Sequence, residues 1–95
     1  GEEFAILLPQ TDVDNAYNLA GEICRGIAAE PVSLENGDSV ALTVSIGVAA
    51  LPATDQRPAR VAGEALLQAA DGAVYQAKRE GRNRVVCAVN PVQPQ

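Results

Sequence analysis

The fold is decided by the stretch Leu42-Thr43-Val44-Ser45-Ile46-Gly47-Val48, residues 42–48. Larger apolar side chains alternate with small ones, which is the two-residue period of a β-strand with one apolar face. The other face carries Thr43, Ser45 and Gly47, whose small side chains allow another backbone or a ligand to come close. The stretch therefore predicts a long strand with two different faces.

The residues before this strand predict the other half of a β-hairpin that spans residues 31–51. Asn36-Gly37 suits a tight turn with positive φ, and apolar residues lie on either side of it. Earlier still, residues 4–8 form a short apolar run that Pro9 stops, which predicts a buried strand. Between the run and the hairpin we expect a helix from the N-cap Thr11 to about Glu30. Its apolar stripe consists of Val13, Ala16, Ala20, Ile23 and Ile27.

The residues after the strand return to helical spacing over residues 59–80. The expected apolar stripe is Leu67, Ala70, Val74 and Ala77, and Gly81 is placed to end the helix. A last strand over residues 83–89 follows. The order strand, helix, hairpin, helix, strand predicts an α/β fold of the α+β sandwich type, in which helices pack on a mainly antiparallel sheet.

Composition excludes several classes of protein. The 95 residues are 47% hydrophobic and only 3% aromatic, which indicates one small globular domain with a core of aliphatic side chains. A net charge of −5 disfavours binding to nucleic acid or anionic lipid. With no apolar stretch long enough to span a bilayer and no signal peptide, we expect a cytoplasmic chain. Cys24 and Cys87, without any histidine, indicate buried free thiols rather than a zinc site.

Two charged groups could carry chemistry. Four of the seven basic residues, Lys78, Arg79, Arg82 and Arg84, lie within seven positions, which suits a small anionic ligand. For Lys78, Arg79 and Arg82, their place at the helix end by itself favours a solvated cap that offsets the helix dipole. The adjacent carboxylates Glu2 and Glu3 beside Gly1 could hold a hard divalent cation near phosphate, or could simply be solvated loop residues. Spacing alone leaves both alternatives open.

Three segments read together resemble the GGDEF family. Residues 1–4, Gly-Glu-Glu-Phe, are similar to the end of the GG(D/E)EF signature, and residues 5–9 to the strand that follows it. Residues 43–49 resemble the family's central strand. Residues 70–83 resemble its last helix, usually written A-D-x-A-(L/V)-Y-x-A-K-x-x-G-R-N. The resemblance implies residues 1–90 of a truncated nucleotidyl-cyclase-like (ferredoxin-like) domain, with a tail at residues 91–95.

The resemblance assigns roles by position. Glu2 matches the catalytic carboxylate that coordinates Mg²⁺ or Mn²⁺, and Glu3 matches the next position of the signature, which we also count among the catalytic residues. Gly1 matches the glycine whose backbone passes close to the nucleotide phosphates. Lys78 and Arg82 match basic positions that contact the triphosphate of GTP.

The resemblance implies a diguanylate cyclase that condenses two GTP molecules into cyclic di-GMP. Two domains of an antiparallel homodimer each supply half of the active site, and an upstream sensor or regulatory domain accompanies the module, through which the parent protein could be tethered to a membrane. Because the sequence begins inside the signature, the family's other metal-binding aspartate and its guanine-selecting residues are missing, and we expect the 95 residues alone to be inactive. The alternative is a non-catalytic GGDEF module that binds GTP or cyclic di-GMP or regulates an attached domain. A third reading is a small interaction domain without a nucleotide role.

Overall fold

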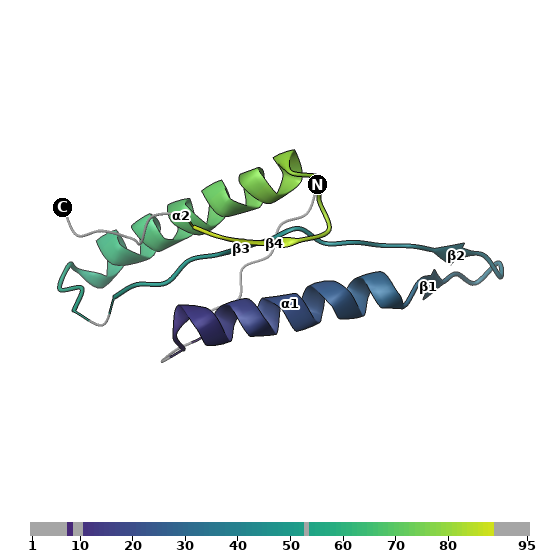
Figure 1. Cartoon of the computed structure of the whole chain (residues 1–95), viewed down its shortest axis with the longest axis horizontal. Helices are drawn as coiled ribbons and strands as arrows, with labels where there is room; N and C mark the ends of the chain where they lie inside the picture. Colours follow the sequence, from purple (N-terminus) through teal and green to yellow (C-terminus); the bar gives the residue numbers. More distant parts are fainter. Residues whose placement is uncertain (1–7, 9–10, 53, 89–95) are drawn as a thin grey trace.

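The computed structural model describes residues 8, 11–52 and 54–88. In this part of the chain, two helices lie on opposite sides of a short pair of strands, and a hairpin extends away from them (Figure 1). The elements are α1 (Val13–Ala29), β1 (Val32–Ser33), β2 (Ser39–Val40), β3 (Ile46–Val48), α2 (Ala59–Arg79) and β4 (Val85–Cys87). The predicted strand of residues 4–8 and the predicted tail lie outside the described residues, apart from Leu8.

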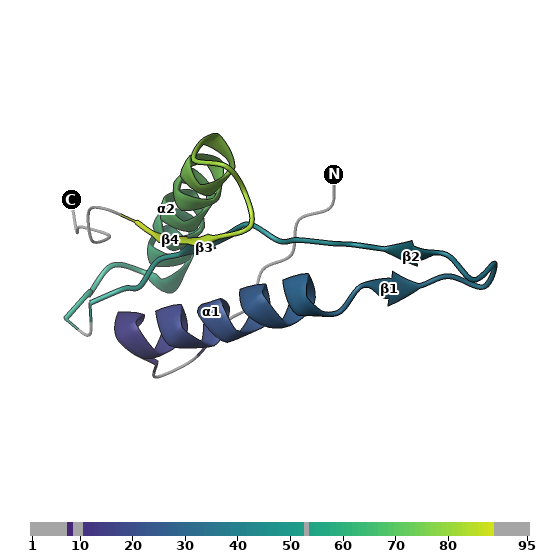
Figure 2. The same ribbon diagram turned by 45° about the vertical axis from the view of Figure 1, so that its right-hand side comes forward.

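The α/β fold predicted from the order of elements is confirmed. Both helices contact β3 and β4, whereas α1 and α2 do not contact each other within the described residues. Turning the molecule keeps α1 and α2 on opposite sides of the strands (Figure 2). The β3–β4 pair is therefore the middle layer between two helices.

The direction of the β3–β4 pair is a local difference from the mainly antiparallel sheet that we expected. Ile46 pairs with Val85 and Val48 with Cys87 in parallel register. Hydrogen bonds from Ile46 N to Arg84 O (2.9 Å) and from Ala88 N to Val48 O (2.8 Å) extend the pairing at both ends. The reason is topological: α2 carries the chain back along the sheet, and a helical crossover joins parallel strands.

The predicted hairpin forms at its tip. β1 and β2 pair antiparallel, with Val32 opposite Val40, and Gly37 adopts the expected positive φ of 90°. Leu34 N donates to Asp38 O at 2.7 Å, which closes a three-residue loop with glycine in the left-handed position. The predicted second arm is divided, because residues 41–45 between β2 and β3 lie in neither strand.

The helix boundaries agree with the sequence prediction except at one cap. Asp12 rather than Thr11 is the N-cap of α1, because its Oδ1 accepts a hydrogen bond from Asn15 N at 2.8 Å. At the other helix, α2 ends at Arg79 with Gly81 at a φ of 125°. Gly81 is therefore the stop that the sequence predicted.

The core consists of small side chains. The buried apolar residues of the described part are Ala20, Cys24, Val48, Ala62, Ala73 and Ala77. The predicted apolar stripe on α2 was wrong at Leu67, which is 59% exposed. The stripe that faces the sheet runs through Ala73 and Ala77, and Leu67 lies to one side of it. No helix of the described residues is long and apolar enough to span a bilayer.

Candidate functional site

The candidate phosphate-binding residues lie where α2 ends and the chain turns toward β4. Gly81 N donates to Lys78 O (3.4 Å) and Arg82 N donates to Ala77 O (2.9 Å). This pair of hydrogen bonds is a Schellman motif, which satisfies two of the carbonyls at the end of the helix. The motif joins Lys78, in the last turn of α2, to Arg82, just beyond it. The structure thus brings the backbones of these two predicted residues together.

Three consecutive residues of this turn have positive φ. Gly81, Arg82 and Asn83 have φ angles of 125°, 65° and 49°, which is the left-handed region. Glycine enters this region without steric cost and asparagine tolerates it, whereas arginine rarely adopts it. We refer to Gly81–Asn83 as the left-handed turn. Strained backbone of this kind persists only where the surrounding structure holds it, and it is found often at functional sites.

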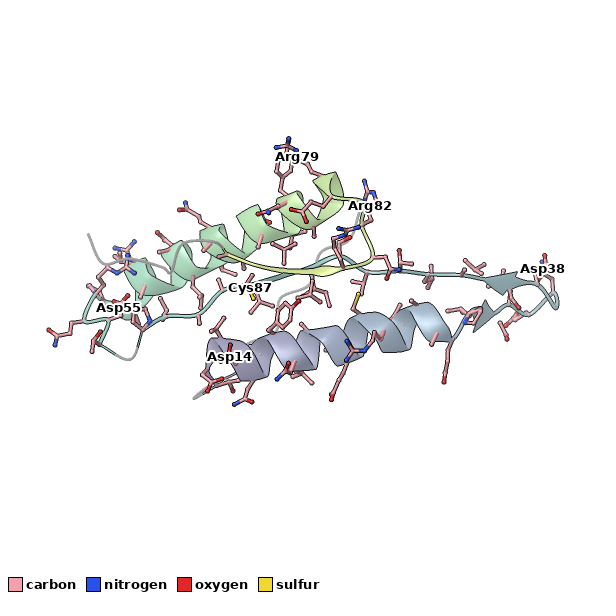
Figure 3. The ribbon with its side chains drawn as sticks, in the orientation of Figure 1. Asp14, Asp38, Asp55, Arg79, Arg82 and Cys87 are labelled. Atoms are coloured by element: carbon pink, nitrogen blue, oxygen red, sulfur yellow. The ribbon has the colours of Figure 1, made fainter. Side chains whose placement is uncertain are left out.

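Two further basic side chains near the end of α2, those of Arg79 and Arg84, contact neighbouring residues. The guanidinium carbon of Arg79 lies 5.8 Å from the centroid of the Tyr75 ring, a cation–π distance. Arg84 Nη1 lies 3.7 Å from Glu80 Oε1, and Arg84 Nε donates to the carbonyl of Arg82 at 3.1 Å. Within the described part of the chain, the Arg82 guanidinium makes no hydrogen bond or ion pair. Figure 3 labels Arg82 at the end of α2, beyond Arg79.

The left-handed turn is also tied to α1. Cys24 is buried on α1, and its Sγ lies 3.7 Å from Asn83 Oδ1 and 3.5 Å from Val44 O. The single thiol proton therefore has two acceptors within reach. Neither Cys24 nor Asn83 is a site residue that the sequence predicts. An asparagine that follows Gly-Arg at a helix end was the available signal, because few residues other than glycine accept the left-handed conformation.

A groove of about 490 Å³ lies between α1 and the left-handed turn. It is lined by Tyr17, Asn18, Gly21, Glu22, Cys24, Arg25, Asn83, Arg84 and Val85. Its wall therefore includes both residues of the Cys24–Asn83 contact, and its charged side chains are of both signs.

The second thiol, Cys87, is free like Cys24. It is half-buried on β4, and burial, followed by the nearby Asp14 carboxylate, raises the pKa of the Cys87 thiol. Figure 3 shows where Cys87 and Asp14 lie along β4 and α1. A raised thiol pKa lowers the fraction of reactive thiolate, which is typical of a structural cysteine.

The predicted metal and signature residues Gly1, Glu2 and Glu3 lie outside the described residues. Among residues 8, 11–52 and 54–88, no three histidine, cysteine, aspartate or glutamate side chains come together as a metal site. Of the predicted site residues, the described part contains Lys78 and Arg82.

Comparison with known proteins identifies the family. The sequence profile described as "Diguanylate cyclase, GGDEF domain" matches residues 1–84. The chain is 40% identical over 85 residues to an uncharacterized protein, YhcK, of Bacillus subtilis, covering 90% of the chain and 22% of YhcK. It is 39% identical over 87 residues to the response regulator PleD of Caulobacter vibrioides, covering 90% of the chain and 18% of PleD.

A third relative carries an enzyme name. The chain is 38% identical over 88 residues to the diguanylate cyclase DgcP of Pseudomonas aeruginosa, covering 93% of the chain and 12% of DgcP. The chain thus spans about a fifth or less of the length of these relatives. The profile match covers most of the chain, and it includes both the candidate phosphate residues and the signature segment. The chain belongs to the GGDEF family of diguanylate cyclase domains.

Proposed function

We propose that residues 1–90 belong to a diguanylate cyclase domain that condenses two GTP molecules into cyclic di-GMP, with residues 91–95 as a tail. The observation that carries the proposal is the left-handed turn, which presents a guanidinium that is unpaired within the described residues next to the last turn of α2. A cap that only offsets the helix dipole needs no strained backbone beyond the helix. A triphosphate would supply the anion that Arg82 lacks among the described residues.

Five residues have proposed roles in this site. Lys78 and Arg82 bind the triphosphate, and Gly1 lets its backbone approach the phosphates. Glu2, with Glu3 beside it, is the catalytic carboxylate of the signature. A carboxylate oxygen is the ligand type that Mg²⁺ or Mn²⁺ prefers, so Glu2 would hold the ion. When bound, the ion would neutralise charge on the phosphoryl oxygens.

The proposed reaction needs two copies of the domain. In an antiparallel homodimer, the 3′-hydroxyl of one GTP attacks the α-phosphorus of the other, and pyrophosphate leaves. The 3′-hydroxyl of the second nucleotide then attacks the α-phosphorus of the first, which closes the ring and releases a second pyrophosphate. Two GTP thus give one cyclic di-GMP and two pyrophosphates. Lys78 and Arg82 hold each triphosphate in line and stabilise the charge that develops on it. We place the reaction in the cytoplasm, where GTP is available, under the control of an attached sensor or regulatory domain.

The first test is Glu2→Gln in the full-length protein. We expect cyclic di-GMP synthesis at saturating Mg²⁺ to fall by about a hundredfold or more, because the change removes the proposed metal-binding charge. Circular dichroism should be unchanged. Glu35→Gln, at an exposed position in the hairpin loop, is the control that should retain activity. Substantial synthesis by Glu2→Gln would contradict the metal-ligand role.

The second test separates phosphate binding from base binding. Lys78→Ala and Arg82→Ala should each weaken binding of 3′-deoxy-GTP, which lacks the attacking hydroxyl, by about tenfold or more. Binding of guanosine should change little. Arg60→Ala, an exposed cation at the other end of α2, is the control. Equal losses for both ligands, or none, would favour the helix-cap interpretation. A wild-type protein that binds GTP but forms no cyclic di-GMP would favour a non-catalytic GGDEF module.

A further inference from the structure

The left-handed turn is held by three different elements of the fold. Its first residues bond to α2 through the Schellman motif, in which Arg82 N donates to Ala77 O. The residue that follows it, Arg84, bonds to β3, because Arg84 O accepts from Ile46 N at 2.9 Å. The side of the turn attaches to α1 through Asn83 Oδ1 and Cys24 Sγ. The Asn83–Cys24 contact spans 59 positions of the sequence and is the only one of the three made by a side chain of the turn.

The side chains of residues 81–84 differ in what they contact. Gly81 has none, and a Cβ there would lie 2.8 Å from Arg84 Nη2. Arg84 bonds to Glu80 and to the Arg82 carbonyl. Asn83 points its amide oxygen at a thiol that is only 6% exposed. Arg82 is left as the side chain that the described part of the fold does not use.

We propose that Asn83 is a positioning residue for the phosphate-binding step, with Cys24 as its anchor. Asn83 tolerates the left-handed backbone, and its contact with Cys24 fixes the turn against α1. Together these features set the direction in which the preceding residue, Arg82, projects. The inference rests on the proposed function, because it acts through the Arg82–phosphate contact.

The test uses the full-length protein and titration with 3′-deoxy-GTP and with guanosine. Asn83→Gly keeps a backbone that accepts positive φ but removes the contact with Cys24, and Cys24→Ala removes the same contact from the other side. Each should weaken 3′-deoxy-GTP binding by roughly threefold to tenfold, the factor that one hydrogen bond contributes, and leave guanosine binding unchanged. Cys24→Ser keeps a donor and should bind like the wild type.

Asn36→Gly is the matched control, since it removes an asparagine side chain from the loop of the β1–β2 hairpin. Figure 3 labels its neighbour Asp38 at the hairpin tip, far along the molecule from Arg82. The hydrogen bonds of Asn36 with Asp38 also hold a turn, but we propose no ligand for that turn. We expect Asn36→Gly to leave 3′-deoxy-GTP binding unchanged.

The deciding comparison repeats Asn83→Gly and Cys24→Ala in an Arg82→Ala background. If the pair acts through Arg82, neither substitution weakens binding further there, because the group that they position is gone. Equal losses in both backgrounds, or no loss in the wild-type background while Arg82→Ala still weakens binding, would overturn the inference. If Arg82→Ala alone has no effect, the phosphate role in the proposed function has failed first. Should Asn83→Gly not fold, the Cys24→Ala and Cys24→Ser pair decides the question.

Discussion

Gly47 is the residue at which the sheet and α2 approach most closely among the described glycines. A Cβ at this position would lie 2.2 Å from Ala70 O and 2.6 Å from Val74 N, both backbone atoms of α2. Such contacts cannot be relieved by rotating a side chain. The small face of the strand of residues 42–48 therefore serves, at Gly47, the close approach of another backbone rather than of a ligand.

We expect Gly47→Ala to lower the free energy of unfolding by about 2 to 3 kcal/mol, because β3 and α2 must move apart to admit the methyl group. Thermal and urea unfolding of the full-length protein measure this. Gly26→Ala is the matched control, since Gly26 lies at an exposed position of α1 with nothing within 4 Å of its Cβ position. That substitution should stabilise the protein by up to about 1 kcal/mol. Similar effects of the two would mean that Gly47 is not a close-contact residue.

The loop between β3 and α2 is organised by one ion pair. Asp55 accepts hydrogen bonds from Arg57 N (3.0 Å), Nε (3.2 Å) and Nη2 (2.6 Å), and the Asp55 side chain is 4% exposed. The hydrogen bonds from the Arg57 side chain, and then from its backbone N–H, lower the pKa of Asp55. Arg57 directly precedes Pro58, the N-cap of α2, so the pair sets how the chain enters that helix.

The lowered pKa predicts a pH dependence of stability. Because the folded state binds the Asp55 proton less tightly than the unfolded state, the contribution of the pair is present above pH ~4 and is lost as the pH falls through the lower folded-state pKa. We therefore expect Asp55→Asn to lower the midpoint of thermal unfolding at pH 7, and this difference from the wild type to shrink below pH ~4. Asp71→Asn, at an exposed position on α2, should show little of this pattern. A difference that stays constant from pH 7 to pH 3 would contradict the prediction.

The whole molecule is elongated, with extents of 53 × 26 × 21 Å, and the β1–β2 hairpin reaches beyond the helices (Figure 1). The buried apolar residues of the described part are alanines, Cys24 and Val48. Many larger apolar side chains stay exposed there, including Val32, Leu34, Val40 and Leu42 on and beside the hairpin. Apolar surface of this kind favours contact with further protein.

We expect the 95-residue chain, expressed alone, to be weakly stable or self-associated and to make no cyclic di-GMP. The reason is that its exposed apolar side chains gain from association, while a core of alanines contributes little stability. Sedimentation, thermal unfolding and a cyclase assay on the isolated chain measure the three properties. A cooperative, stable monomer that makes cyclic di-GMP would contradict this prediction.

The sequence by itself determined the features that depend on near neighbours. The 3.6-residue period predicts α1 and α2, Asn36-Gly37 predicts the hairpin loop, and Gly81 predicts the end of α2, because capping and turn chemistry act over a few residues. The family was also readable from short segments. The roles of Gly1, Glu2 and Glu3 stay predictions from that resemblance.

The tertiary structure alone decided what depends on residues distant in sequence. The exposure of Leu67 and the parallel β3–β4 pair follow from how α2 packs on the strands. A local sequence pattern does not predict that packing. The Cys24–Asn83 contact exists only because α1 packs beside the left-handed turn. Periodicity marks which face of an element is apolar, but packing against other elements selects which side chains are covered and which are left for a ligand.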